Sequence, residues 1–148
     1  MKTPSGRFLD GAVMSDPSRQ PIIGLTLRHD RTDGFWFTLL HECAHVSLHF
    51  STPMEGETVF IDDLEIRSED EYEREADALA RESLIPSNIL DQVNWGPNTT
   101  VEDLMTLATR ARVHLSIAAR RWQRDHQNYK RFSRLIERNA IRQLFQIA

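Results

Sequence analysis

Cysteine is almost absent from this sequence of 148 residues, in which Cys43 is the single one. One thiol excludes an internal disulfide, a composition that fits a reducing compartment. The sequence also lacks an apolar run long enough to cross a bilayer, and residues 1–20 lack the apolar core of a signal peptide. These absences exclude disulfide-stapled scaffolds and helical membrane proteins, and they predict a cytoplasmic protein with no membrane partner.

The composition itself is ordinary for a globular protein, with 40% hydrophobic and 27% charged residues. A chain of this length can bury a core without disulfides. The loop WGPNTT at residues 95–100 is the clearest break in the pattern. We therefore expect a main domain over residues 1–94 and a helical C-terminal subdomain over residues 95–148. Because a strand is predicted close to the N-terminus, the chain also reads as a piece of a longer protein.

Charges of one sign are scarce in two parts of the chain. Residues 51–103 carry 15 acidic residues and three arginines, whereas residues 104–148 carry two acidic residues and ten basic ones. The simpler interpretation is that the two parts complement each other or form two solvated faces. The alternative is that the basic part binds an acidic partner or nucleic acid. We adopt the first interpretation.

Two short apolar runs open the chain, AVMS at residues 12–15 and IIGLTL at residues 22–27. The turn-forming stretch DPSRQP between them predicts a hairpin. From Phe35 to Phe50, apolar residues fall on nearly every side of a helix capped by Asp33, which predicts a buried helix. The run TVFIDDLEI at residues 58–66 predicts another strand.

Helical patterns dominate the rest of the chain. Ser68 begins a predicted helix that ends at Pro86 and has acidic residues in its first turn, where the helix dipole favours them. Residues 101–125 predict two helices joined near residues 112–114, and residues 129–145 are partly helical. The predicted fold class is α+β: a small, mostly antiparallel sheet packed on a buried helix, a second helix, and a helical C-terminal region.

The predicted buried helix contains the pentapeptide His41-Glu42-Cys43-Ala44-His45, which matches H-E-x-x-H. Residues four apart on a helix lie on one face, so the two imidazoles can bind one Zn²⁺ ion. Glu42 lies about 100° further round the helix. There it can act as the general base of a hydrolysis without binding the metal. Polar side chains in so apolar a helix need partners, and a metal ion is an efficient one.

A catalytic zinc site usually has three protein ligands, and His₂Glu is one such set. His49 has the wrong spacing for the third ligand, so we expect it to be a polar helix-end residue or a contact of a ligand. On the next helix Glu73 lies within the apolar stripe and is the predicted third ligand. Asp77, one turn later, is placed to hold a ligating histidine by its other ring nitrogen. Glu75 falls on the outer face and is predicted to be solvated.

This pair of motifs resembles the ImmA/IrrE family of metallopeptidases, a gluzincin-like group often fused to a Cro/C1-type helix-turn-helix domain. Members follow H-E-x-x-H with E-x-E-A-(N/D)-x-(F/L)-A, then two apolar residues and a proline. Here the second motif runs from Glu73 to Ala80 and is followed by Leu84-Ile85-Pro86, with Leu79 where phenylalanine is commoner. The resemblance covers roughly residues 20 to 135 and is specific for the two motifs.

The resemblance implies a zinc-dependent regulatory endopeptidase with a zincin-like core. By that analogy His41, His45 and Glu73 bind Zn²⁺ and Glu42 is the general base. The implied substrate is a protein partner, a helix-turn-helix transcriptional repressor or an antitoxin, cleaved in stress or mobile-element regulation. No motif spacing identifies the residue that would stabilise the oxyanion. The sequence patterns do not predict the oligomeric state.

Two other functions fit parts of the same sequence. The zinc fold can serve a non-catalytic regulator, although Glu42 argues against a degenerate site because metal binding does not require it. The helices after residue 101, with Ala108 and Ile117 inward and basic residues 120–124, can also form a DNA-binding helix-turn-helix. Against this, the turn contains no glycine, so we expect direct nucleic-acid binding to be the less favoured function.

Overall fold

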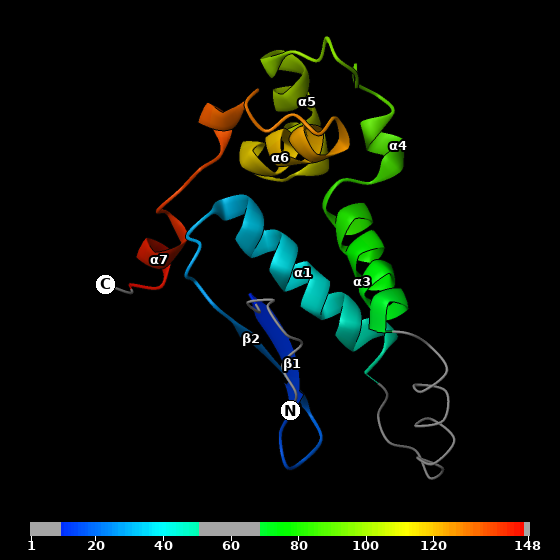
Figure 1. The fold of residues 1–148 in the computed structure, drawn as a ribbon, viewed down its shortest axis with the longest axis vertical. Coiled ribbons are helices and arrows are strands. Elements are labelled where there is room, and N and C mark those ends of the chain that lie inside the picture. The colour runs from blue at the N-terminus through cyan, green and yellow to red at the C-terminus, as the bar shows by residue number, and fades with distance from the viewer. Residues whose placement is uncertain (1–9, 51–68, 147–148) are drawn as a thin grey trace.

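The computed structural model describes residues 10–50 and 69–146, and it has the predicted α+β class. A two-stranded antiparallel sheet lies below a long central helix, and further helices gather above it (Figure 1). The strands and helices of the described residues, in chain order, are β1 (Gly11–Ser15), β2 (Pro21–Leu25), α1 (Thr32–Leu48), α3 (Glu69–Leu84), α4 (Ser87–Leu90), α5 (Val101–Ala111), α6 (Leu115–Asp125), the 3-10 helix η1 (Ser133–Leu135) and α7 (Ile141–Leu144). The predicted strand at residues 58–66 and the predicted helix start at Ser68 lie outside the described residues.

The predicted hairpin is confirmed, with Ala12 opposite Gly24 and Met14 opposite Ile22. Its turn is closed by Asp16, whose carboxylate accepts a hydrogen bond of 2.8 Å from the Gln20 amide. A Cβ atom on Gly11 would lie only 2.8 Å from Thr38 Cγ2 and 3.0 Å from Glu42 Cγ on α1. Glycine at this position therefore lets β1 approach the helix that carries the H-E-x-x-H motif.

Helix α1 begins three residues before the predicted start, and Asp33 does not cap it. The Asp33 carboxylate instead accepts hydrogen bonds of 2.5 and 3.2 Å from the Arg31 guanidinium, within the first turn. The first turn is held by the C-terminal part of the chain, because Thr32 Oγ1 donates a hydrogen bond of 2.6 Å to Glu137 Oε1. Tertiary contacts thus replace the expected local cap.

The expectation that α1 is buried on every side is not confirmed. Of its residues, Thr32, Asp33, Glu42 and Ala44 are buried, while Trp36 is 43% exposed and Leu48 49% exposed. The aromatic run at its start explains the difference, since Phe35 and Trp36 pack edge to face on one another at 5.5 Å rather than into a core.

The large buried side chains gather instead around α5 and α6. Trp122 is 2% exposed, and Leu104 and Leu107 are fully buried. Leu84 and Ile85, at the end of α3, belong to the same core, so it includes residues from both sides of the predicted boundary at 94/95. The division into two domains stays a prediction.

Local signals fix the two helices of this core. A capping box joins Thr100 and Asp103 at the start of α5, and Arg112 takes the left-handed conformation (φ 56°) in the turn before α6. Ala108 and Ile117 are buried, as predicted.

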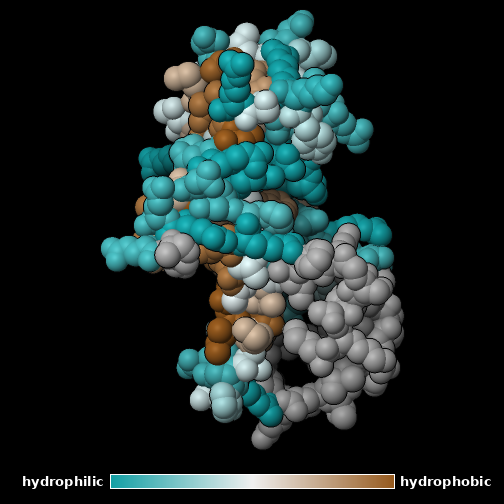
Figure 2. All heavy atoms as spheres, turned by 60° about the vertical axis from the view of Figure 1, so that its left-hand side comes forward, coloured by the Kyte–Doolittle hydropathy of each residue, from teal (hydrophilic) through white to brown (hydrophobic). Residues whose placement is uncertain are grey.

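Figure 2 shows a hydrophilic band across the middle of one face and a hydrophobic strip at the height of the hairpin. Met14 (47% exposed) and Ile22 (46% exposed) contribute apolar surface from the two strands.

Among the described residues, no helix combines the length and apolar composition that crossing a bilayer requires.

Candidate metal centre

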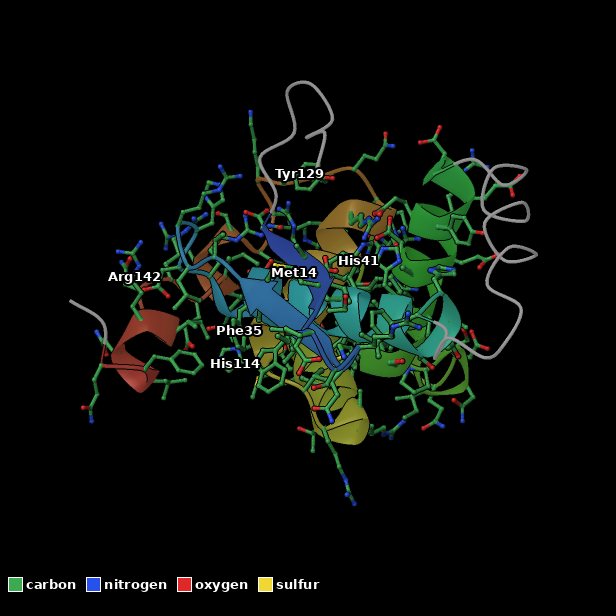
Figure 3. All side chains as sticks on the ribbon, turned by 90° about the horizontal axis from the view of Figure 1, so that it is seen from below. Met14, Phe35, His41, His114, Tyr129 and Arg142 are labelled. Carbon is green, nitrogen blue, oxygen red and sulfur yellow. The ribbon has the colours of Figure 1, made fainter. Side chains whose placement is uncertain are left out.

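The two histidines of the H-E-x-x-H motif lie one turn apart on α1. Figure 3 shows His41 on the side of α1 that faces α3. Their Nε2 atoms are 3.1 Å apart. The first turns of α3 bring Glu73 to the same point, with Oε2 3.0 Å from His41 Nε2 and Oε1 3.1 Å from His45 Nε2. Two imidazoles and one carboxylate therefore converge, as a His₂Glu site requires.

The spacing of these atoms suits a small divalent cation. One ligand atom from each of the three residues lies within 4.8 Å of the others. With metal–ligand bonds of about 2.0–2.2 Å, tetrahedral zinc ligands lie about 3.3–3.6 Å from one another. The observed separations of 3.0–3.1 Å are slightly shorter, and the cluster is compatible with a metal ion at its centre.

Each histidine has a partner on its outer nitrogen. His41 Nδ1 lies 2.8 Å from Asp77 Oδ1, at ion-pair distance although not aligned for a hydrogen bond. His45 Nδ1 lies 2.9 Å from His49 Nδ1, and His49 Nε2 lies 2.8 Å from Glu75 Oε2. If His49 donates to the Glu75 carboxylate, its Nδ1 accepts from His45 Nδ1–H. His45 is then held with a free electron pair on Nε2, the form that binds metals, and the Asp77 carboxylate beside His41 Nδ1 favours the same tautomer of His41.

The electrostatics of His45 agree with that tautomer. Burial lowers the pKa of His45 below its ordinary value, and the neighbouring His41 and His49 lower it further, while Glu73 opposes them. A neutral imidazole is the metal-binding form.

Glu42 is buried, with 7% of its surface exposed, on the α1 face covered by the hairpin. Burial raises the pKa of Glu42 above its ordinary value; His41 works against this, and the negative charge of Glu73 adds to it. A carboxylate whose pKa is shifted toward neutrality is suited to accept and return a proton.

The structure thus brings His41, His45 and Glu73 together, with Asp77 beside His41. One sequence prediction about burial is wrong: the Glu73 side chain is 48% exposed rather than part of the buried stripe. Glu73 lies in the second turn of α3, where it reaches α1 from an open edge of the helix pair.

Glu75 is exposed, as predicted, with 44% of its side chain open to solvent, and its carboxylate also contacts His49. The His49 ring packs edge to face on Tyr72 at 4.4 Å, and Tyr72 lies between Glu73 and Glu75 around α3. The angular position of Glu75 around α3 does not show that the end of α1, with His49, lies beside it. The spacing of His41, His45 and His49, four residues apart each time, is the signal that could have revealed His49 as a neighbour of His45.

His114 and His126 serve the helical core: His114 caps α6, and the His126 ring stacks on Trp122 at 4.5 Å. Tyr129 is half exposed and lines a pocket beside α1.

Comparison with known proteins identifies one family. A family model described as the IrrE N-terminal-like domain, of peptidase family M78, matches residues 8–123. The match includes the hairpin, both histidines, Glu42, Glu73 and nearly all of α6. No curated protein and no solved structure matches the chain.

Proposed function

This chain belongs to the family of IrrE N-terminal-like domains, peptidase family M78, and from that premise we propose that it is a zinc-dependent endopeptidase that cleaves a protein partner. The observation that carries the proposal is the convergence of His41 Nε2, His45 Nε2 and the Glu73 carboxylate within 3.0–3.1 Å in a chain of a peptidase family. A bound zinc ion would supply Lewis-acid activation of water and of the peptide carbonyl.

The residues of the chain supply the rest of the chemistry. His41, His45 and Glu73 hold the metal, and Asp77 and His49 orient the two imidazoles. Glu42 accepts the proton of the attacking water and returns it to the leaving amine. Its burial under the hairpin restricts competing solvent around the carboxylate.

The hairpin is the proposed docking edge for an extended substrate. In the described sheet, each strand pairs on one side only, so the outer edge of each strand remains for a further strand. The resemblance to ImmA/IrrE peptidases favours a helix-turn-helix repressor or an antitoxin in the cytoplasm as the partner. Disruption of residues 22–27 is expected to abolish cleavage while zinc content stays unchanged.

The proposed activity is tested by Glu42→Gln, with Cys43→Ala as the matched control in the same motif. Both proteins are loaded with zinc and incubated with a peptide library prepared from a denatured proteome, and new termini are identified by mass spectrometry. Glu42→Gln is expected to keep one zinc per chain and to lose about 10²–10⁴-fold in cleavage rate. Cleavage by Glu42→Gln at the wild-type rate would exclude the proposed mechanism, and a zinc-loaded wild type that cleaves nothing would favour a non-catalytic regulator.

A further inference from the structure

A pocket of about 310 Å³ adjoins the metal centre, between α1, the second half of α3 and α6. Phe37 lies one turn before His41 on α1, with their ring centroids 6.1 Å apart. Arg81 lies one turn after Asp77 on α3, with Nη2 4.0 Å from Asp77 Oδ2. The pocket therefore continues the line of the metal centre along the same two helices. Tyr129, labelled in Figure 3, lines the pocket.

The pocket is rich in positive charge. Arginines from three elements line it, and the carboxylates in its lining are those of Asp10 and Asp33. Asp33 is occupied by Arg31, and Asp10 accepts a hydrogen bond of 3.1 Å from Arg28. The lining arginines are Arg31, Arg81, Arg120, Arg121 and Arg124.

Two of these arginines have donors to spare. Arg81 Nε is buried and has no hydrogen-bond partner, and Arg81 Nη2 lies 4.0 Å from the carboxylate of Asp77, which also contacts His41. Within the described ranges the Arg124 guanidinium makes no hydrogen bond or ion pair, and it lies over the Phe37 ring, 5.5 Å from the centroid. Burial lowers the pKa of Arg124, and the positive charge of Arg81 lowers it further. Two cations that repel each other beside a buried unpaired donor favour an anionic occupant.

We infer that this pocket binds a carboxylate side chain, Asp or Glu, of the peptide that the metal centre cleaves, with Arg81 and Arg124 as its donors. The inference rests on the proposed function, because it gives that activity a preference for acidic substrates. Arg81 follows Glu73 by eight residues, a rise of about 12 Å along α3. An extended peptide advances about 3.3 Å per residue. The acidic side chain therefore lies about three or four residues from the cleaved bond.

Helix α6 fits this role better than it fits DNA recognition. Six of its residues are buried, from Ser116 to Gln123, and Asp125 is exposed. Arg121 is 20% exposed and pairs with Asp125, at 2.9 Å. A helix that reads a major groove needs a solvent-exposed face of donors, whereas the arginines of α6 line a pocket of about 310 Å³.

The test measures binding apart from cleavage. Fluorescein-labelled (Glu-Ala)₅ and (Gln-Ala)₅ are titrated with the zinc-loaded full chain carrying Glu42→Gln, and anisotropy is recorded. We expect the Glu peptide to bind at least about tenfold more tightly. The double change Arg81→Gln/Arg124→Gln is expected to bring the ratio close to one. Arg74→Gln/Arg134→Gln removes the same charge from exposed positions and is expected to keep the preference.

A second measurement locates the side chain. Cleavage sites of the wild type in the peptide library are aligned, and an excess of Asp and Glu is expected at one position, about three or four residues from the bond. The excess is expected to disappear in the Arg81/Arg124 double variant, with zinc content and circular dichroism checked.

The outcomes separate the two proposals. Selective binding of the Glu peptide that depends on Arg81 and Arg124, without any cleavage, leaves the pocket standing and removes the peptidase. Equal binding of the two peptides by the chain that keeps Arg81 and Arg124 overturns the inference. That result holds even if the chain is found to cleave peptides. Tighter binding of duplex DNA, lost in the same double variant, would overturn it in favour of nucleic acid.

Discussion

The two ends of the α1–α3 pair are built from different residues. At the end that holds the histidines, the buried apolar side chains are small, namely Ala44, Ala76 and Ala80. At the end beyond Leu84, large side chains such as Trp122 and Leu104 fill a core between α5 and α6. The difference separates two tasks. Alanines let the two helices approach closely enough for imidazoles on one to meet a carboxylate on the other, whereas the helical core buries large apolar side chains.

The largest expected effect is a loss in the free energy of unfolding when the core around α5 and α6 is disrupted. Trp122 is 2% exposed, and its Nε1–H donates a hydrogen bond of 3.0 Å to the Gly96 carbonyl. Trp122→Ala is expected to lower the free energy of unfolding by about 3–5 kcal/mol, measured by urea denaturation. Trp36→Ala, the same change at a residue 43% exposed, is the control and is expected to cost about 1 kcal/mol or less. Equal losses would mean that stability is not concentrated around α5 and α6.

The next effect concerns the contact between the hairpin and α1. A Cβ atom at Gly11 meets Thr38 and Glu42, so Gly11→Ala is expected to lower the free energy of unfolding by about 1–3 kcal/mol and to reduce cleavage by displacing Glu42. Gly96→Ala is the control at the helical end, because a Cβ atom there meets nothing within 4 Å. A Gly11→Ala protein with wild-type stability and activity would show that the hairpin does not fix Glu42.

A smaller effect, on zinc affinity, concerns the residues around His45 at the end of the α1–α3 pair that holds the histidines. His49→Leu and Glu75→Gln remove the contacts that orient His45, and each is expected to weaken zinc binding by about 10–100-fold, measured with a competing chelator. Glu71→Gln, an exposed acid on the same helix, is the control. Unchanged affinity in both variants would reduce His49 to a packing residue on Tyr72.

The smallest expected effect follows from the raised pKa of Glu42. An acid whose folded-state pKa is raised destabilises the fold as the pH rises from the ordinary pKa through the folded-state value, and the loss is complete above it. The metal-free Glu42→Gln protein is therefore expected to melt at a higher temperature than metal-free wild type near pH 7. The gap is expected to shrink near pH 4, about the ordinary pKa of glutamate. A variant that melts below the wild type near pH 7 would contradict this sign.

Much of this arrangement could be predicted from the sequence because the signals are local. The i, i+4 spacing of His41 and His45 places both on one helical face, and a turn sequence between two apolar runs predicts the hairpin. Angles around a single helix predict Glu73 and Asp77 as the residues nearest the metal site, and both carboxylates lie beside the histidines.

The other contacts depend on how the helices and strands cross one another in space, and local sequence patterns carry no information on that crossing. The start of α1 is set by Glu137, 105 residues away, rather than by Asp33. The contact of Glu75 with His49 depends on where the last turn of α1 lies against α3. The basic pocket joins residues of α1, α3 and α6, so the excess of positive charge after residue 104 could be noticed in the sequence but not located.

The central claim, that His41, His45 and Glu73 bind one divalent ion, is tested most directly by zinc titration of the purified metal-free chain. Wild type and Glu71→Ala are expected to bind one zinc per chain, and His41→Ala and Glu73→Ala to lose more than about 100-fold in affinity while remaining folded. Wild-type zinc affinity in both His41→Ala and Glu73→Ala would contradict the account.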